Sequence, residues 1–423
     1  MEANPRESAY DLLRRWRRSK VFADELLDEE LSQGRLSPPD RGLVTELFYG
    51  WLRQRLALEF LTGQLASHPP RAPVALILQL GLYQIFYLEK IPAHAAVNES
   101  VALAKRHASA AEAGFVNAAL RRALTEREAL SARLAAVRKT EPWTWFSHPR
   151  WLFERWRKER GLEAALALCE WDNMPPETYL RTNTLKAAGQ PPDLAVERVA
   201  FHPLAWKVVR PAEVFRTKSW ASGAYYVQDP STLLAVDALD PQPGEQVLDV
   251  CSAPGGKTTY IAAKMQDRGR IVAADSSSSR LRLVGENCRR LGVTIVATIA
   301  CEGTHLEQCL RGNGFDRVLV DAPCSNTGVL RRRVDLRWRI EEKEIARLAA
   351  LQGRLLGAAA AFTKPGGVLV YSTCSLEPEE NGRVADAFAR GHPEFLLETT
   401  RSTFPPKDGV DGAFVARFRR RAV

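Results

Sequence analysis

The sequence predicts an all-helical N-terminal domain followed by an α/β domain built on a parallel sheet. Residues 1 to about 135 show helical periodicity and no convincing strand. From about Glu141 the chain becomes rich in Trp and Arg. After residue 230, strand-like and helical segments alternate, which is typical of a parallel sheet with helices on both faces. We therefore expect an all-helical domain at 1–140, a connector and small subdomain at 141–230, and the α/β domain at 231–423.

Four segments of the N-terminal region are expected to be helices. In the first, apolar residues recur at i, i+3 and i+4, and Asp40, after Pro38-Pro39, is the expected N-cap. The second is apolar on most sides, which favours a central place in a bundle. The four expected helices are residues 40–61, 72–88, 92–108 and 111–124.

The region 141–230 opens with "EPWTWFSHPRWLFERWRKERG" and contains a helical segment at 162–173 and a strand and turn in "TYLRTNTLK". An extended, basic and aromatic region can hold RNA by stacking and phosphate contacts. The aromatic side chains can equally be hydrophobic anchors that close a connector onto the next domain. Both interpretations stay open.

The C-terminal region is expected to contain five strands with helical segments between most of them. Ligands of such parallel sheets bind at the carboxyl ends of the strands, so that edge is where functional residues are sought. The expected strands are Gln246–Val250, Arg270–Ala274, Val293–Ala300, Asp316–Val320 and Val368–Tyr371.

Composition limits the class of protein and its partners. The 423 residues are 45% hydrophobic and 26% charged, which is ordinary for a globular protein, and the net charge of +9 favours a polyanionic partner, nucleic acid first. The alternative is a merely basic enzyme. None of the seven cysteines forms a CxxC pair, so we expect no zinc or other metal, no disulfide scaffold and a reducing compartment. The charged N-terminus and the lack of a long apolar run predict a cytoplasmic protein without a membrane partner.

The segment "VLDVCSAPGGKTT" looks at first like a phosphate-binding loop. A GxxxxGK[ST] loop would need glycine at position 251, where this chain has Cys251, and Pro254 removes a backbone donor within the turn. The loop also lacks the GxGxxG of a dinucleotide-binding fold. A triphosphate is therefore not the expected ligand.

The same loop suits a different nucleoside. Asp249 ends one strand and Asp275 ends the next, where an acid can accept both ribose hydroxyls. A helix that opens after Gly256 favours a carboxylate at its N-terminus. A nucleoside with an amino-acid tail and no phosphate is S-adenosylmethionine; an NAD-type cofactor and a purely structural turn remain rivals on this evidence.

Two cysteines follow two strands of the expected sheet. "VLVDAPCSNTGVLRR" puts Asp321 and Cys324 after one strand, and "VLVYSTCSLEPEEN" puts Cys374 after another. A single cysteine at such a place is more often a packing residue than a nucleophile. Two thiols and an acid at one edge are what C5 methylation of a pyrimidine requires: a thiolate adds to C6 to activate C5, an acid assists at N3, and a base removes the C5 proton. Methylation of an exocyclic amine would favour Asp/Asn-Pro-Pro-aromatic instead of Asp321-Ala322-Pro323-Cys324.

With these motifs the sequence closely resembles the Sun (Fmu, RsmB-type) family of RNA cytosine-C5 methyltransferases. The matching stretches include "RTNTLK", "QDPST", "DVCSAPGGKTT", "DAPCSNTGVLRR", "YSTCSLEPEEN" and "DGAFVARF". The helical half resembles a NusB-like RNA-binding domain through "DRGLVTELFYGWLR", "LGLYQIFYLEKIPAHAAVNESV" and "GFVNAALRR". The resemblance covers nearly the whole chain and implies a Rossmann-like methyltransferase domain preceded by an all-α NusB-like domain.

The resemblance also implies roles for individual residues. Cys374 would be the nucleophile, Cys324 would act in product release as a base, and Asp321 would lie beside the methyl donor and the target base. Spacing alone cannot rank the two thiols. The residues implied to hold S-adenosylmethionine are Cys251, Ser252, Ala253, Pro254, Gly255, Gly256, Lys257, Asp275, Glu302 and Asp321.

The sequence departs from the family pattern at two places. Where the family commonly has an Asp for the adenine, this chain has the longer Glu302. After the Pro-Cys motif, Arg333-Val334-Asp335 replaces the usual Asn-Pro or His-Pro pair before an Asp. The run "RRRVDLRWR" is basic enough to meet phosphates, or it is a solvated basic face. Lys257 is expected near the substrate or the carboxylates of the loop.

The resemblance thus implies methylation of C5 of one cytidine in RNA, most readily 16S ribosomal RNA, through a covalent cysteine–C6 adduct, by a protein expected to be a monomer. The same chemistry on transfer RNA stays open, as does an RNA-binding assembly factor without activity. The sequence names neither the cytidine nor the state of the RNA, naked or in a ribosomal particle.

Overall fold

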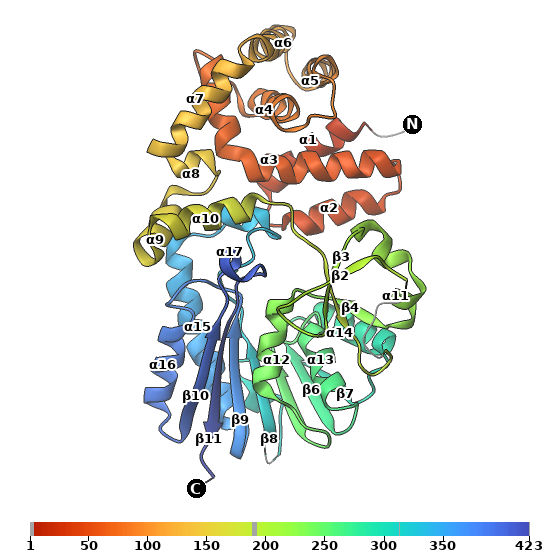
Figure 1. Cartoon of the computed structure of the whole chain (residues 1–423), viewed down its shortest axis with the longest axis vertical. Helices are drawn as coiled ribbons and strands as arrows, with labels where there is room; N and C mark the ends of the chain where they lie inside the picture. The colour runs from red at the N-terminus through yellow and green to blue at the C-terminus, as the bar shows by residue number, and fades with distance from the viewer. Residues whose placement is uncertain (1–3, 188–192, 313, 423) are drawn as a thin grey trace. The chain divides into compact units, whose positions relative to one another are not determined.

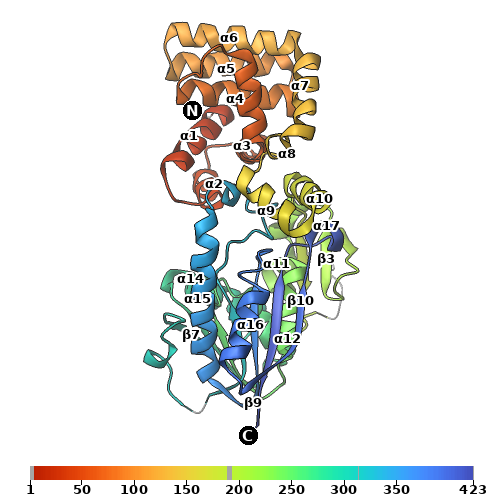
Figure 2. The same ribbon diagram turned by 90° about the vertical axis from the view of Figure 1, so that its left-hand side faces the viewer.

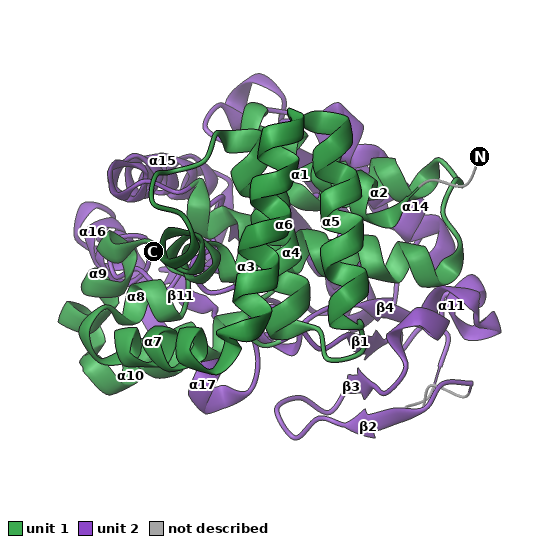
Figure 3. Ribbon diagram, turned by 90° about the horizontal axis from the view of Figure 1, so that it is seen from above, with its two compact units in different colours: residues 1–174, 330–339 green, residues 175–329, 340–423 purple. Residues whose placement is uncertain are grey.

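A computed structural model describes residues 4–187, 193–312 and 314–422, which form two compact units. Unit 1 comprises residues 1–174 and 330–339, and unit 2 comprises residues 175–329 and 340–423 (Figure 3). A short segment from the middle of the second half of the chain thus belongs to the helical first unit. The domain limits expected at residues 140 and 230 were drawn from sequence pattern, whereas the two units are defined by compactness. These limits stay predictions.

Unit 1 is all-helical (Figure 1, red to yellow). The four helices expected from periodicity are present as α3 to α6, and each expected N-terminus lies within two residues of the observed one. The helices of the unit are α1 (Pro5–Arg18), α2 (Ala23–Ser32), α3 (Pro38–Leu65), α4 (Ala72–Tyr87), α5 (Ala93–His107), α6 (Ala110–Thr125), α7 (Arg127–Thr140), α8 (Pro142–Trp145), α9 (Arg150–Arg160) and α10 (Leu162–Asn173), with the 3-10 turn η4 (Val334–Trp338).

The start of α3 corrects the expected N-cap. Ser37, rather than Asp40, is the cap, and its hydroxyl accepts from the Asp40 backbone N–H at 3.4 Å. Pro38 and Pro39 occupy the first helical positions, where a missing N–H costs nothing because it would have no helical partner. Asp40 therefore lies in the first turn, where its negative charge complements the helix dipole.

The central place expected for α4 is confirmed. Every residue from Leu76 to Ile85 is buried, so α4 is covered on all sides by the other helices of the unit. Its buried polar groups have partners: Gln79 accepts a hydrogen bond of 2.9 Å from the indole of Trp51. Burial of this kind is tolerated because the polar atoms are hydrogen-bonded.

One interpretation of the sequence required an extended chain after Glu141. The structure shows helices there instead. The first part of this region forms α8, α9 and α10, because its apolar residues recur at helical spacing: Leu152, Phe153 and Trp156 of α9 are all buried. At least these side chains are hydrophobic anchors. The strand expected in "TYLRTNTLK" is present in unit 2 as β1 (Tyr179–Thr182).

Unit 2 contains a small antiparallel sheet and a larger mixed sheet. The small sheet has the order β2-β3-β1-β4, and the larger one has the order β10-β11-β9-β8-β5-β6-β7. The remaining strands are β2 (Val196–Arg198), β3 (Ala205–Val208), β4 (Tyr225–Val227), β5 (Gln246–Val250), β6 (Arg270–Asp275), β7 (Val296–Ala300), β8 (Phe315–Asp321), β9 (Thr363–Thr373), β10 (Phe395–Ser402) and β11 (Phe414–Arg420).

All five expected strands lie in the larger sheet as β5 to β9, and they run parallel to one another. The sequence did not predict β10 and β11, which extend the sheet antiparallel beyond β9. The predicted sheet of parallel strands is therefore confirmed as five adjacent strands on one side of a mixed sheet.

Helices cover both faces of this sheet (Figure 2). On one face, α12, α13 and α14 pack against Val247, Ile271 and Leu319, and on the other face, α15 and α16 pack against Leu248, Val318 and Leu369. The helical segments of unit 2 are α11 (Lys218–Ser222), α12 (Leu233–Leu239), α13 (Gly256–Lys264), α14 (Ser278–Leu291), α15 (Glu342–Ala361), α16 (Gly382–Gly391) and α17 (Pro405–Asp408), with the 3-10 turns η1 (Pro211–Arg216), η2 (Pro230–Thr232) and η3 (Leu306–Gln308). In the part of the chain that the structure describes, no helix is both long and apolar enough to cross a membrane.

Candidate active site

The polar residues singled out in the sequence gather at the carboxyl edge of the larger sheet. The strands β9, β8, β5 and β6 are neighbours and parallel, so their carboxyl ends meet at one edge. Asp321 ends β8, Asp275 ends β6, and Cys374 follows β9 directly. Asp249 lies one residue before the end of β5. Sheet topology alone thus brings these four side chains to the same edge.

The glycine loop joins β5 to α13 through backbone conformations with positive φ. Cys251 has φ 62° and Gly255 has φ 101°. A Cβ on Gly255 would stand 3.1 Å from the Cα of Val284, so the loop passes closely over α14. The loop is tied to the next strand, because the Ser252 N–H donates to the Ala274 carbonyl at 3.0 Å. Helix α13 then begins at Gly256, which leaves its N-terminal N–H groups at the sheet edge.

Asp275 supports the loop and keeps acceptor capacity. Its two carboxylate oxygens accept from the backbone N–H groups of Ala253 at 3.1 Å and Ser277 at 3.0 Å. Asp275 is buried, with 5% of the residue exposed. Each oxygen has a second lone pair, so a pair of hydroxyl donors can still bind there.

Two polar atoms of the loop lack a partner among the described residues. They are Oδ1 of Asp249 and Oγ of Ser252, both buried. The other oxygen of Asp249 accepts from the Thr258 hydroxyl at 2.6 Å. Burial raises the pKa of Asp249 to about 7, against the effect of the Thr258 hydrogen bond. Buried polar atoms are rarely left without partners, so these two atoms mark a place that a ligand can satisfy.

Lys257 forms an ion pair with Asp321 across the sheet edge. The Nζ–Oδ2 distance is 2.7 Å, and the side chains are 16% and 32% exposed. The other oxygen of Asp321 accepts from the hydroxyl of Ser372 in β9 at 2.8 Å. Burial acts to lower the pKa of Lys257, but the charge and the hydrogen bond of Asp321 raise it further, so the ammonium is retained. The lysine of the glycine loop therefore contacts a carboxylate at the end of β8 rather than one of the loop itself.

The two thiols of the Pro-Cys and Thr-Cys motifs are in contact. The Sγ atoms of Cys324 and Cys374 lie 3.3 Å apart. The Cys374 thiol donates to Oδ1 of Asn326 at 3.0 Å, and the amide of Asn326 donates to the Cys324 carbonyl at 2.8 Å. Asn326 has φ 59°, a left-handed conformation that Asn adopts more readily than most residues.

The environments of the two thiols differ. Cys324 is 8% exposed, whereas Cys374 is half-buried and so more accessible. The pKa of the Cys324 thiol lies well above its ordinary value, first because of the hydrogen bond with Cys374 and then because of burial. Cys324 is therefore a protonated thiol as long as the hydrogen bond between the two thiols is present.

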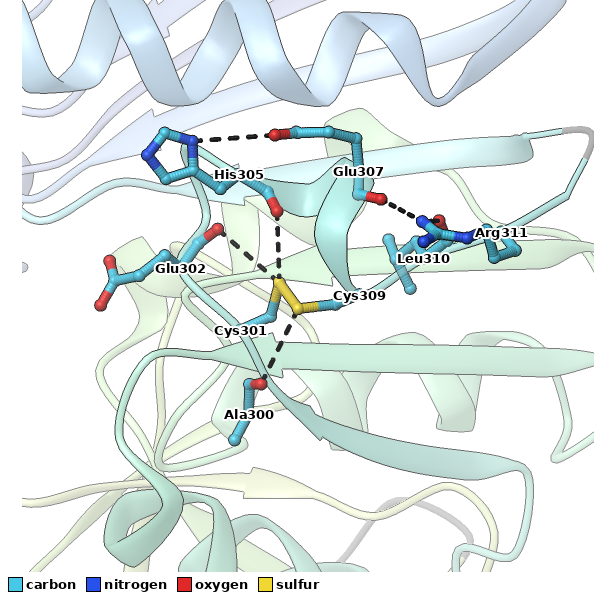
Figure 4. Close-up of a disulfide and its surroundings, with 8 residues drawn as sticks. All are labelled: Ala300, Cys301, Glu302, His305, Glu307, Cys309, Leu310 and Arg311. Carbon is cyan, nitrogen blue, oxygen red and sulfur yellow. Dashed lines mark hydrogen bonds and ion pairs between the residues drawn. A yellow bond between two sulfur atoms is a disulfide. The ribbon is translucent and has the colours of Figure 1, made fainter.

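The loop after β7 holds Glu302 and also a disulfide that the sequence did not predict. Cys301 and Cys309 are bonded to each other with a Cα–Cα distance of 6.2 Å, and Glu302 is exposed with its carboxylate directed away from the sulfur atoms (Figure 4). The cysteine pattern indicated no disulfide scaffold, and this single bond was not predicted. The fold brings the two cysteines together because β7 ends at Ala300 and the turn η3 returns the chain to it.

The basic run 331–339 is neither a solvated face nor free to meet phosphates along its length. Arg331 is 3% exposed, Val334 and Arg337 are 0% exposed, and Arg333 is exposed. The segment belongs to unit 1, where Arg337 donates to Oδ1 of Asn173 at 2.7 Å and to the Asp172 carbonyl at 2.9 Å. Neither phosphate binding nor a solvated basic face therefore describes most residues of the run, because most of them are buried.

Sequence reasoning missed four residues of the site. Asp249 was noted as a strand end but not assigned to the site. Asn326, Ser372 and Glu380 lie within quoted motifs, yet polar residues within a few positions of a cysteine are too common to single out. Their contacts depend on the pairing of loops that are about 50 residues apart in the chain. Among the described residues, no group of three or more His, Cys, Asp or Glu side chains is arranged to hold a metal ion.

Three family models match the chain. Residues 236–419 match the model described as 16S rRNA methyltransferase RsmB/F, and residues 3–125 match the NusB family. Residues 148–190 match the ferredoxin-like domain of RsmF/B-like methyltransferases.

Curated relatives match over nearly the whole length. A Bacillus subtilis (strain 168) protein with the name "Probable ribosomal RNA small subunit methyltransferase B" is 34% identical, covering 98% of each chain. The "Ribosomal RNA small subunit methyltransferase B" of Klebsiella pneumoniae subsp. pneumoniae is also 34% identical, covering 92% of each.

Solved structures share the fold. The crystal structure of PH0851 superposes with a TM-score of 0.80 at 23% identity, covering 99% of this chain and all of that one. A methyltransferase homologue from Pyrococcus horikoshii gives a TM-score of 0.58 at 30% identity, covering 65% of this chain and 96% of the other. The NSun6 protein of Pyrococcus horikoshii, solved with SFG, gives 0.59 at 23% identity, covering 64% and 98%.

Proposed function

The chain belongs to the RsmB/F family of 16S rRNA methyltransferases, and we propose that it methylates carbon 5 of one cytidine in small-subunit ribosomal RNA with S-adenosylmethionine as methyl donor. The observation that carries the C5 chemistry is the 3.3 Å contact between the Sγ atoms of Cys324 and Cys374. A pair of thiols in contact, beside an acid, provides both a nucleophile and a proton acceptor for one carbon–carbon double bond.

The donor set of the glycine loop fits S-adenosylmethionine. The N-terminus of α13 suits the carboxylate of the amino-acid part, and the partnerless Oδ1 of Asp249 suits its ammonium group. Asp275 has acceptor capacity for the ribose hydroxyls, and the exposed Glu302 would meet the adenine. Pro254 and the lack of a free cation in the loop disfavour a phosphate: Lys257 is paired with Asp321. In support, the fold neighbour NSun6 was solved with SFG, an analogue of this cofactor.

When bound, S-adenosylmethionine supplies a methyl group with the electron deficiency of its sulfonium. The task of the protein is to make C5 of cytosine nucleophilic enough to accept that group. The lone pair of the Cys374 thiolate forms a bond to C6, and the electron pair of the C5–C6 double bond becomes available at C5. Cys374 suits this role because it is the more exposed thiol, and because the Lys257 ammonium interacts with it electrostatically.

Asp321 and Lys257 would act together on the base. Addition of the thiolate increases negative charge on the pyrimidine ring, so an acidic group near N3 lowers the barrier. The ion pair supplies a donor and an acceptor at fixed positions, since Ser372 holds the second oxygen of Asp321. Preorganised polar groups of this kind stabilise charge that develops in the transition state.

Cys324 would complete the cycle by removing the C5 proton. Once the Sγ of Cys374 is bonded to C6, it is a neutral thioether, so the thiol–thiol hydrogen bond that is the first cause of the raised Cys324 pKa is removed, together with the charge of Cys374. Cys324 then releases its own thiol proton to solvent, and the resulting thiolate takes the proton from C5. The C–H electron pair restores the double bond to C6, and the carbon–sulfur bond breaks to return the pair to Cys374.

The roles of the two cysteines predict opposite behaviour of two variants. Cys374→Ala should be inactive and form no adduct. Cys324→Ala should form the C6 adduct and accumulate it, because the C5 proton is not removed. Denaturing gels of protein incubated with S-adenosylmethionine and radiolabelled 16S RNA measure both results.

Cys288→Ala is the matched control, since Cys288 is a buried free cysteine in α14 outside the site. It should methylate RNA at the wild-type rate. Turnover by Cys324→Ala together with trapping by Cys374→Ala would reverse the two roles.

The substrate is tested separately from the chemistry. Bisulfite sequencing of RNA from a deletion strain should show the loss of one methylated cytidine in 16S RNA. Loss of a site in transfer RNA instead would contradict the proposed substrate class. Absence of S-adenosylmethionine binding in a calorimetric titration would favour an assembly factor without activity.

A further inference from the structure

We propose that Glu380 is a positioning residue that holds the two cysteine loops together, so that Cys324 and Cys374 present their sulfur atoms to the same base. The inference deepens the proposed function and rests on it for its catalytic consequence. Glu380 lies six residues beyond Cys374, in the turn before α16, and it is 0% exposed. The cysteine loops are defined here as residues 323–328 and 373–377.

One oxygen of Glu380 fixes the Pro-Cys loop. Its Oε1 accepts from the backbone N–H of Ser325 at 2.8 Å and from the side-chain amide of Gln352 at 3.0 Å. The same amide of Gln352 donates to the carbonyl of Pro323 at 2.9 Å. Gln352 and Glu380 therefore hold the residues on both sides of Cys324.

The other oxygen of Glu380 joins the two loops. Its Oε2 accepts from the hydroxyl of Ser375 at 2.5 Å and also from the hydroxyl of Ser325. These serines directly follow Cys374 and Cys324 in the sequence, and their Oγ atoms lie 3.0 Å apart. A single carboxylate group thus contacts the neighbour of each reactive cysteine.

A buried carboxylate has a higher free-energy cost than a neutral side chain that only connected the two loops. Burial raises the pKa of Glu380, against four hydrogen bonds that favour its charged form. All four donors are neutral groups, and burial of a carboxylate without a paired cation is unfavourable. A neutral side chain would connect the loops at lower cost, but no neutral side chain accepts four hydrogen bonds from two oxygens in this geometry.

Other contacts join the two loops independently of Glu380, one of them at the backbone of Cys374. The Leu376 N–H donates to the Thr327 hydroxyl at 2.9 Å, and the Gly328 N–H donates to the Cys374 carbonyl at 3.0 Å. A Cβ on Gly328 would stand 2.8 Å from that carbonyl, so the backbones approach closely there. Loss of the Glu380 carboxylate should therefore leave the fold intact and loosen the segments that carry the sulfur atoms.

Glu380 also has an electrostatic effect on the site. Its negative charge adds to the hydrogen bond and the burial that raise the pKa of Cys324. It thus favours the neutral thiol at Cys324 before the substrate adds, while Cys374 is the sulfur that attacks.

The substitution that tests the proposal is Glu380→Gln, which keeps the size of the side chain but has one acceptor oxygen instead of two. We expect kcat for methylation to fall about 10- to 100-fold, as for a small misplacement of reacting groups, with KM for RNA and Kd for S-adenosylmethionine within about twofold of wild type. Ser375→Ala removes one of the four hydrogen bonds and should lower kcat by a smaller factor, about 3- to 10-fold. Glu379→Gln is the matched control, because Glu379 is adjacent and pairs with Arg383 at 3.1 Å, and it should match wild type.

A second measurement reports on the cysteine geometry without RNA. Diamide removes two protons and two electrons from a pair of thiols and is itself reduced to the hydrazine, so it converts Cys324 and Cys374 to a disulfide. Peptide mass spectrometry follows the formation of this bond. It should be about tenfold slower in Glu380→Gln than in wild type or Glu379→Gln, because the sulfur atoms are held less often at contact distance.

The outcomes separate the two proposals. Wild-type kcat in Glu380→Gln, or a lowered kcat with an unchanged rate of disulfide formation, would overturn the positioning role. A loss of S-adenosylmethionine affinity equal to the loss of kcat would indicate a general structural role and would also overturn it. If wild-type protein does not methylate RNA, the proposed function fails, and the diamide rates alone decide whether Glu380 holds the loops.

Discussion

At the scale of single residues, the proximity of several carboxylates at one sheet edge has a measurable electrostatic cost. Asp249 is 0% exposed, and burial, with a contribution from the charge of Asp321, raises its pKa to about 7. The carboxylate form is therefore disfavoured in the folded protein relative to the unfolded chain, where the pKa is about 4. A strongly raised pKa of this kind is typical of a residue that serves ligand binding at the expense of folding stability.

Asp249→Asn should therefore stabilise unit 2 in a pH-dependent manner. The penalty for the wild-type carboxylate is absent below the unfolded pKa of about 4, grows as the pH rises to the folded value of about 7, and is constant above it. We expect the variant to gain about 2 kcal/mol at pH 5.5 and up to about 4 kcal/mol at pH 8 in the absence of cofactor. Thermal unfolding at the two pH values measures the difference, and an equal gain at both would contradict the raised pKa.

The same variant should bind S-adenosylmethionine more weakly. A neutral amide replaces the acceptor proposed for the ammonium group, and loss of a charged hydrogen bond costs about 1.5–3 kcal/mol. Calorimetric titration at pH 8 should show the affinity reduced by about tenfold or more. Unchanged affinity would remove Asp249 from the cofactor site.

The residues predicted from the sequence and those missed differ in a physical way. Asp321, Cys324 and Cys374 could be found because each follows an apolar strand, and the ends of parallel strands meet at one edge. Asn326 and Glu380 act through contacts between two loops, and neither loop shows in its own sequence which partner it will meet. The disulfide of Cys301 and Cys309 was missed because their spacing matches no familiar pattern.

At the scale of elements, the packing of α3 on α4 depends on one glycine. A Cβ on Gly50 would lie 2.0 Å from Cζ and Oη of Tyr83, so the Tyr83 ring occupies the space beside the α3 backbone. The Tyr83 hydroxyl cannot withdraw without loss, since it donates to Oε1 of Glu46 at 2.6 Å. The sequence marks Gly50 only as a poor helix former within a helix.

Gly50→Ala should destabilise unit 1 by about 2–4 kcal/mol, because the methyl group forces the helices apart in a close-packed core. Gly63→Ala is the matched control in the same helix, where a Cβ would have no atom within 4 Å. It should be neutral or stabilise by up to about 1 kcal/mol through helix propensity. Chemical denaturation followed by tryptophan fluorescence compares the two, and similar effects would contradict the role of the Tyr83 contact.

Elements with a strong local pattern were predicted, and those defined by their neighbours were not. The strands β5 to β9 stand out as apolar runs because helices bury both faces of the sheet. Strand β10 has few buried residues, and β11 is rich in arginine, so neither has the apolar run of a central strand. Helices α8 and α9 were obscured by tryptophan and arginine, which occur in many kinds of structure, whereas α10 coincides with the helical segment predicted at 162–173.

At the scale of the whole molecule, unit 1 is completed by a segment that the chain supplies late. Residues 330–339 provide Arg337, which is 0% exposed and donates to unit 1 groups that include the Asp172 carbonyl at 2.9 Å. They also provide Asp335, whose Oδ2 accepts from the Ala23 N–H at 3.0 Å and the Trp16 indole at 3.3 Å. Side chains of residues 330–339 therefore form hydrogen bonds with polar groups inside unit 1 that would otherwise need water.

Arg337→Ala should lower the stability of unit 1 by about 3 kcal/mol or more, since it removes a buried cation and leaves its acceptors without donors. Arg333→Ala, in the same segment but at an exposed residue, should change it by no more than about 0.5 kcal/mol. Differential scanning calorimetry should show the change in the transition of unit 1. Equal effects of the two variants would mean that the segment only lies on the surface of the unit.

The late arrival of this segment has a consequence for synthesis on the ribosome. The helices of unit 1 leave the exit tunnel first, but the side chains that close their interior at Trp16 and Asp172 belong to residues made after the glycine loop and after Cys324. Domains of nascent chains generally fold in order from the N-terminus. Here the N-terminal unit can make these contacts only after residue 339 has emerged, when β5 to β8 of the other unit are already made, although β9 to β11 of that unit are made later still.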